Sequence, residues 1–116
     1  MANRKFMFIY PDQLNQPRPH EPSPAQMQEM FARWQAWKTK FKENIIDMGD
    51  ALKPGGKVLA GGVVTDGPYP ESKEVVGGYS IVSAGSYEHA AEIARECPIT
   101  LIPNARIEIR ELAGYG

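Results

Sequence analysis

One stretch in the middle of the chain decides the fold, and it reads Val63-Val64-Thr65-Asp66-Gly67-Pro68-Tyr69-Pro70-Glu71-Ser72-Lys73-Glu74, followed by Gly77-Gly78-Tyr79. An Asp-Gly-Pro turn and a charged cluster separate two apolar, strand-like runs at residues 57–64 and 75–83. Glycine adopts the positive φ that a tight reversal needs, and proline holds φ at about −65°. We therefore expect two antiparallel strands joined by a rigid loop that presents polar side chains.

The N-terminal part of the chain predicts a strand, a loop and a long helix. Residues 5–10 are apolar on both alternating sets, which is typical of a central strand. Five prolines between residues 11 and 24 predict an irregular loop, and His20 lies within it. Ser23-Pro24-Ala25-Gln26 is a strong helix start, and Gly49 is its expected C-terminal stop. Apolar residues at steps of three and four form one stripe, which we interpret as core packing: Met27, Met30, Phe31, Trp34, Trp37, Phe41, Ile45 and Met48.

The C-terminal part predicts a second helix and a last strand. Ser86 is the expected N-cap of the helix, which places Cys97 as a small buried side chain before Pro98. Residues 105–112 alternate as a half-buried strand, and Gly61-Gly62 suggests a bulge or a close backbone approach in the second strand. The order strand, helix, strand, strand, helix, strand predicts an α+β, ferredoxin-like βαββαβ fold. Its four-stranded antiparallel sheet should have the first and third strands at the centre and both helices on one face.

Length and charge restrict the class of protein. The chain has 116 residues, which fits a single domain over residues 1–116, and its net charge is −1. Nucleic acid is therefore not an expected partner, and the N-terminal apolar run stops at Pro11, too early for a membrane span. Cys97 is the only cysteine, which favours the cytoplasm. The sequence has no Walker loop, no HExxH motif and no Ser-His-Asp order, so we expect neither a metal nor another cofactor.

The face of the sheet that the helices do not cover predicts a homodimer. Exposing either apolar set of the first strand would leave a patch that soluble monomers rarely tolerate, and a second copy is the simplest cover. Between the sheet and its partner we expect a cleft for a small molecule, lined by Tyr10, Tyr79 and Arg106 or Arg110.

The stretch from Val64 to Glu74 resembles the signature of YCII-related proteins of the DGPF type, with Tyr69 where the usual residue is Phe. Gly78-Tyr79, Ser86-Tyr87-Glu88-His89-Ala90, Cys97-Pro98 and Ile107-Glu108-Ile109-Arg110 extend the resemblance. It implies a ferredoxin-like dimer related to the dimeric α/β-barrel proteins, mostly bacterial and mostly without an assigned reaction. Some relatives look like small-molecule enzymes and others accompany sigma factors. Members of this type often carry a longer segment with an extra strand before the signature, whereas here Pro54 leads quickly into the second strand.

Two functions are compatible with these residues. In the first, the protein is a cofactor-independent lyase or isomerase: Asp66 acts as general base or orients another group, and His20, which the resemblance weakly links to a His and Asp pair, shuttles the proton. A free carboxylate titrates at about 3.9, so Asp66 would need burial to act as a base at neutral pH. Side chains expected to bind the substrate are Tyr10, Tyr69, Lys73 and Tyr79. In the second, the protein is a non-catalytic dimeric ligand-binding or regulatory module, and Asp66 only closes its own turn.

Overall fold

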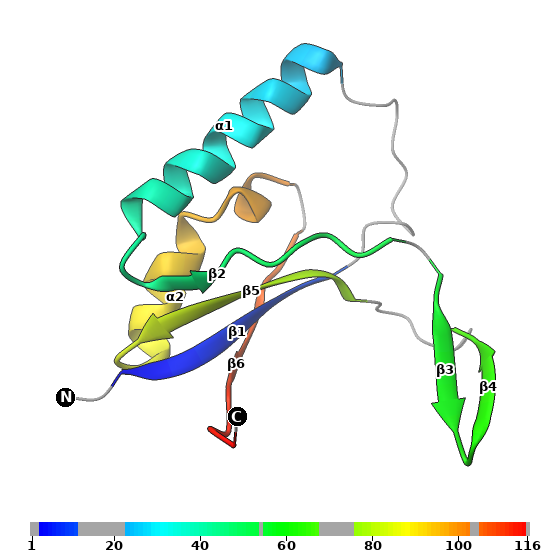
Figure 1. The fold of residues 1–116 in the computed structure, drawn as a ribbon. Helices are drawn as coiled ribbons and strands as arrows, with labels where there is room; N and C mark the ends of the chain where they lie inside the picture. Colours follow the sequence, from blue (N-terminus) through cyan, green and yellow to red (C-terminus); the bar gives the residue numbers. More distant parts are fainter. Residues whose placement is uncertain (1–2, 12–22, 54, 68–75, 103–104, 116) are drawn as a thin grey trace.

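The computed structural model describes residues 3–11, 23–53, 55–67, 76–102 and 105–115 (Figure 1). Two long strands, β1 (Arg4–Pro11) and β5 (Val76–Ala84), pair antiparallel along almost their whole lengths. The short strand β2 (Ile45–Asp47) extends the sheet beside β5, and β6 (Glu108–Glu111) extends it beside β1. The four-stranded order is therefore β2-β5-β1-β6, and it confirms that the first and third expected strands are central.

Both helices pack on one face of this sheet, as predicted. Helix α1 (Pro24–Lys40) places the Trp37 ring 6.4 Å from the Phe8 ring, and α2 (Tyr87–Arg95) places the Tyr87 ring 4.9 Å from the Phe6 ring. Since Phe6 and Phe8 belong to the same alternating set of β1, the two helices lie on the same side. The buried core consists of Phe6, Phe8, Tyr10, Trp37, Val82, Ala84, Ala90, Ile93, Ala94 and Cys97. The protein is thus an α+β domain, compatible with a ferredoxin-like fold.

Helix α1 starts as predicted but ends earlier. The Ser23 side chain accepts from the Gln26 backbone N–H, and the Gln26 side chain accepts from the Ser23 N–H, which completes a capping box. The expected stop at Gly49 is wrong, because the helix ends at Lys40 and a turn then leads into β2. Phe41, Ile45 and Met48 still pack against the core, but from that turn, the strand and the segment after it. Periodic spacing alone therefore could not show where the helix ends.

The expected second strand is a hairpin of its own. Strands β3 (Lys57–Ala60) and β4 (Val63–Asp66) pair only with each other, in a two-stranded sheet apart from the main one (Figure 1). Gly61 and Gly62 have φ of 56° and 76°, so they form the two-residue turn of a hairpin and not the predicted bulge. The strand that pairs with the outer edge of β5 is consequently β2. The segment between α1 and β3 also holds an extra strand, β2, which the sequence did not predict, whereas β3 begins soon after Pro54, as expected.

The expectations for Ser86 and Cys97 are confirmed. Ser86 caps α2 by accepting from the His89 N–H, and Cys97 is fully buried before the 3₁₀ helix η1 (Pro98–Leu101). The sheet face away from the helices carries Met7, Ile9, Ile46 and Ile81, of which Ile46 is 51% exposed. Among the described residues, no helix has both the length and the apolar character needed to cross a membrane.

Candidate ligand cavity

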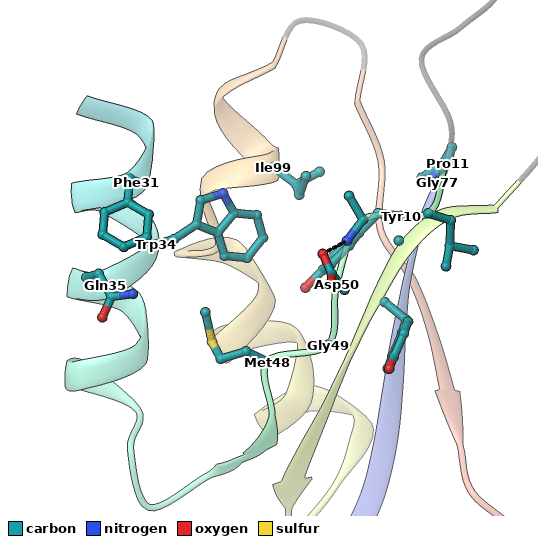
Figure 2. A pocket seen from close by; sticks show the side chains of 14 residues that line it. Tyr10, Pro11, Phe31, Trp34, Gln35, Met48, Gly49, Asp50, Gly77 and Ile99 are labelled. Carbon is teal, nitrogen blue, oxygen red and sulfur yellow. Dashed lines mark hydrogen bonds between the residues drawn. The ribbon is translucent and has the colours of Figure 1, made fainter. Parts of the chain in front are cut away.

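A cavity of about 510 Å³ opens between the middle of α1 and the chain segment that follows β2 (Figure 2). The first residues of β5, the end of β1 and η1 complete its walls. Its lining residues are Tyr10, Pro11, Phe31, Trp34, Gln35, Met48, Gly49, Asp50, Ala51, Leu52, Gly77, Gly78, Tyr79 and Ile99. We call it the α1 cavity.

Aromatic rings form two sides of the α1 cavity. Trp34 projects from α1 toward the strands, and its ring meets that of Tyr10 edge to face, with 6.0 Å between centroids and 65° between planes (Figure 2). Phe31, one turn earlier on the helix, is 65% exposed at the rim. Trp37, by contrast, is only 3% exposed and lies in the core. The aromatic stripe of α1 is therefore core packing at Trp37 and cavity wall at Phe31, and Trp34 between them contacts both the core and the cavity.

The opposite wall is a chain segment held very close to β5. The Leu52 N–H donates to the Gly77 carbonyl at 2.8 Å, and the Tyr79 N–H donates to the Asp50 carbonyl at 3.3 Å. Gly49 makes this approach possible, because a Cβ there would lie 1.8 Å from the Tyr79 carbonyl oxygen. Its φ of 68° is also a conformation that favours glycine. Gly49, the predicted stop of the first helix, thus shapes the cavity instead.

A chain of buried polar groups lies at the base of the cavity. The Cys97 thiol donates to the Tyr10 hydroxyl at 3.6 Å, Tyr10 donates to Ser80 Oγ at 2.8 Å, and Ser80 donates to the Met48 carbonyl at 2.7 Å. Burial raises the pKa of the Tyr10 phenol far above its usual value, and the neighbouring Cys97 adds to the effect. Burial likewise raises the pKa of the Cys97 thiol. Both groups are therefore neutral at physiological pH, and Tyr10 offers the cavity a ring and no charge.

Asp50 supplies the formal charge at this site. Its carboxylate Oδ1 accepts the Ala51 backbone N–H at 2.7 Å, and the side chain is exposed at the cavity mouth (Figure 2). No Lys, Arg or His is found among the described lining residues. The described lining is thus apolar and aromatic over most of its surface, with one carboxylate at the edge.

The family of the chain follows from a sequence comparison that covers all of these elements except β1. The model of the YCII-related domain matches residues 18–113. The chain belongs to the YCII-related domain family. Curated proteins include no significant match to the chain. The match contains three elements of the cavity wall: α1, β5 and the segment that follows β2. Most of the cavity wall therefore lies within the YCII-related domain.

Only some of the residues predicted to form the site of this YCII-related domain line the α1 cavity. Tyr10 and Tyr79 both line the α1 cavity, but Tyr79 alternates with the buried set of β5, so its side chain lies on the other face of the sheet. Asp66 lies at the end of β4, outside the lining, with its side chain 90% exposed and paired with Lys57. The remaining predicted site residues, His20, Tyr69 and Lys73, lie outside the described residues.

The two arginines considered for the cleft do not line the α1 cavity either. Arg110 pairs with Glu108 along β6, and Arg106 precedes that strand. Within the described part of the chain, no group of three or more His, Cys, Asp and Glu side chains is arranged to hold a metal ion.

Sequence reasoning missed the cavity residues on α1 and after β2. The signal was present in the stripe itself, because Met27 and Phe31 precede the part of the helix that a short sheet can cover. Both side chains are more than half exposed in the structure. An aromatic stripe that extends beyond its supporting sheet indicates a surface available for a ligand.

Proposed function

We propose that this YCII-related domain binds a small, largely apolar ligand in the α1 cavity and works as a ligand-binding module. The observation that carries the proposal is the position of Trp34, which packs against the edge of the core that Trp37 fills and also forms the wall of a cavity of about 510 Å³. Cavities of several hundred Å³ with mostly apolar walls and a few polar groups are typical of small-molecule sites.

Acid–base catalysis by Asp66 and His20 is the second candidate, and the geometry supports it less well. A general base must come within hydrogen-bond reach of the proton that it removes. Asp66 lies on the exposed hairpin and pairs with Lys57. It does not line the α1 cavity. The catalytic proposal therefore requires a second cleft around the hairpin, whereas the binding proposal uses a cavity that the described residues already form.

A neutral fluorescent probe tests the binding proposal. N-phenyl-1-naphthylamine carries no charge and brightens in apolar sites, so we expect saturable binding to the full chain. Phe31→Ser should weaken this binding by about tenfold, because removing a large apolar contact costs roughly 1.4 kcal/mol or more. Leu59→Ser is the matched control, since Leu59 is also an exposed apolar residue, at 70%, but lies on the hairpin. Equal affinity in wild type and Phe31→Ser, or an equal loss in both variants, would refute the cavity as the site.

We also propose that two copies associate through the open face of the sheet. Met7, Ile9, Ile46 and Ile81 support this proposal, because they form an apolar face that neither helix covers. Ile46→Lys should yield monomers in light scattering after gel filtration, whereas Leu101→Lys, at a site 55% exposed on η1, should not. A wild-type protein that is monomeric at high concentration would contradict this association.

A cytoplasmic location is part of the same proposal and is supported by the single, buried Cys97.

A further inference from the structure

We infer that the α1 cavity selects a cationic amine with an apolar or aromatic body, held by the rings of Phe31 and Trp34 and by the Asp50 carboxylate. This inference rests on the proposed ligand-binding function and adds the chemical class of the ligand. Its basis is the distribution of charge and of ring surface around one cavity.

The first step concerns charge. Among the described lining residues, Asp50 alone carries a formal charge at neutral pH, and no basic side chain is present to pair with an anion. An anionic ligand would lose water without gaining a counter-ion from the described lining and would be repelled by Asp50. A cation would gain an oppositely charged partner at the mouth of the same cavity.

The second step concerns the free acceptor of Asp50. Oδ1 already accepts the Ala51 N–H, an interaction that fixes the direction of the carboxylate. Within the described residues, Oδ2 makes no hydrogen bond or ion pair. A carboxylate positioned by its own backbone, with one oxygen available, is suited to receive an ammonium N–H or to lie beside a methylated ammonium.

The third step concerns the rings. A cation within about 6 Å of an aromatic face is attracted by the negative potential of that face, most strongly for Trp. Figure 2 shows Trp34 and Phe31 on α1 and Asp50 across the cavity from them. The rings of Tyr10 and Trp34, which meet edge to face, line the inner part of the α1 cavity. Phe31 is exposed at its rim. Rings on one side and a carboxylate on the other form the arrangement that recognises ammonium groups.

The test uses three probes of similar size that differ in charge: benzyltrimethylammonium, phenylacetamide and phenylacetate. Calorimetric titration of the full chain should give an affinity for the cation about tenfold or more above that for the amide, and no saturation with the anion. An amide or anion that binds as tightly as the cation would overturn the inference, even where the neutral dye still binds in a Phe31-dependent manner. Loss of all dye binding, by contrast, would refute the cavity as a ligand site altogether.

A pair of variants separates Asp50 from the overall charge of the protein. Asp50→Asn keeps an oxygen that can accept the Ala51 N–H, and it should weaken cation binding about two- to fivefold with no effect on the amide. Asp47→Asn is the matched control: Asp47 also accepts a backbone N–H, from Gly49 at 2.8 Å, but does not line the cavity. Equal weakening by both variants would show a general charge effect and overturn the role of Asp50.

Discussion

The Tyr10 hydroxyl donates a 2.8 Å hydrogen bond to Ser80 Oγ and so joins the two central strands beneath the helices. Tyr10→Phe should lower the free energy of unfolding by about 1 kcal/mol, because the Ser80 oxygen loses its buried donor. Urea denaturation followed by circular dichroism measures this change. Tyr79→Phe is the control: its hydroxyl has no hydrogen bond within the described residues, and the stability should stay within about 0.5 kcal/mol of wild type. Equal losses in both variants would contradict the role of the buried bond.

Alkaline pH should destabilise the fold through Tyr10 and Cys97. Burial is the largest cause that raises the pKa of both groups in the folded protein. In the unfolded chain the pKa has its ordinary value, 9.0 for Cys97 and 10.0 for Tyr10, whereas the folded chain holds both protons to higher pH. The stabilisation is therefore complete below pH 9 and decreases as pH rises above 9, where unfolded Cys97 titrates, and above 10, where unfolded Tyr10 titrates. Unfolding free energies measured from pH 7 to 11 should fall less steeply for Tyr10→Phe than for wild type, and equal slopes would contradict the assignment.

The Cys97 thiol should be nearly inert in the native protein. Its side chain is fully buried, and its raised pKa lowers the fraction of thiolate, which is the reactive form. At pH 8, labelling with Ellman's reagent should be slower in buffer than in urea by more than about 100-fold, since reaction requires transient opening. Similar rates under both conditions would show that the thiol is accessible in the folded state.

Alanine substitutions at Gly49 and Gly61 form a matched test of how closely the segment after β2 approaches β5. Both have positive φ, so alanine at either position should cost about 1–2 kcal/mol in backbone strain. A Cβ at Gly61 meets nothing within 4 Å, whereas a Cβ at Gly49 would overlap the Tyr79 carbonyl. Gly49→Ala should therefore lower the free energy of unfolding by about 2 kcal/mol more than Gly61→Ala. Similar thermal midpoints for the two variants would contradict the approach of this segment to β5.

Local signals with a single physical cause could be predicted from the sequence. Ser23-Pro24 and Ser86 mark helix starts because a side-chain oxygen accepts an unpaired N–H of the first turn, and the structure shows both bonds. The central position of β1 followed from its two apolar sets, since a strand with neighbours on both edges is covered most completely. These features depend on few residues that are adjacent in the chain.

Features that depend on distant contacts could not be predicted in the same way. The apolar spacing of Trp37, Phe41 and Ile45 continues through the end of α1, because a turn and a strand can present side chains to the same core as a helix. Gly61-Gly62 fits a bulge or a hairpin turn, and the pairing of Ala60 with Val63 across these two glycines identifies the turn. The α1 cavity depends on Gly49 lying over Tyr79, a contact between residues thirty positions apart.

The separation of β3 and β4 from the main sheet has a consequence for how the molecule opens. An isolated two-stranded hairpin is marginally stable in water. Strands β3 and β4 form no ladder hydrogen bonds with the four-stranded sheet. The domain is therefore energetically uneven, with a cooperative unit around β1 and β5 and a hairpin that can open by itself. Its backbone amides would exchange with deuterium long before those of the central strands, and opening it would leave the buried core in place.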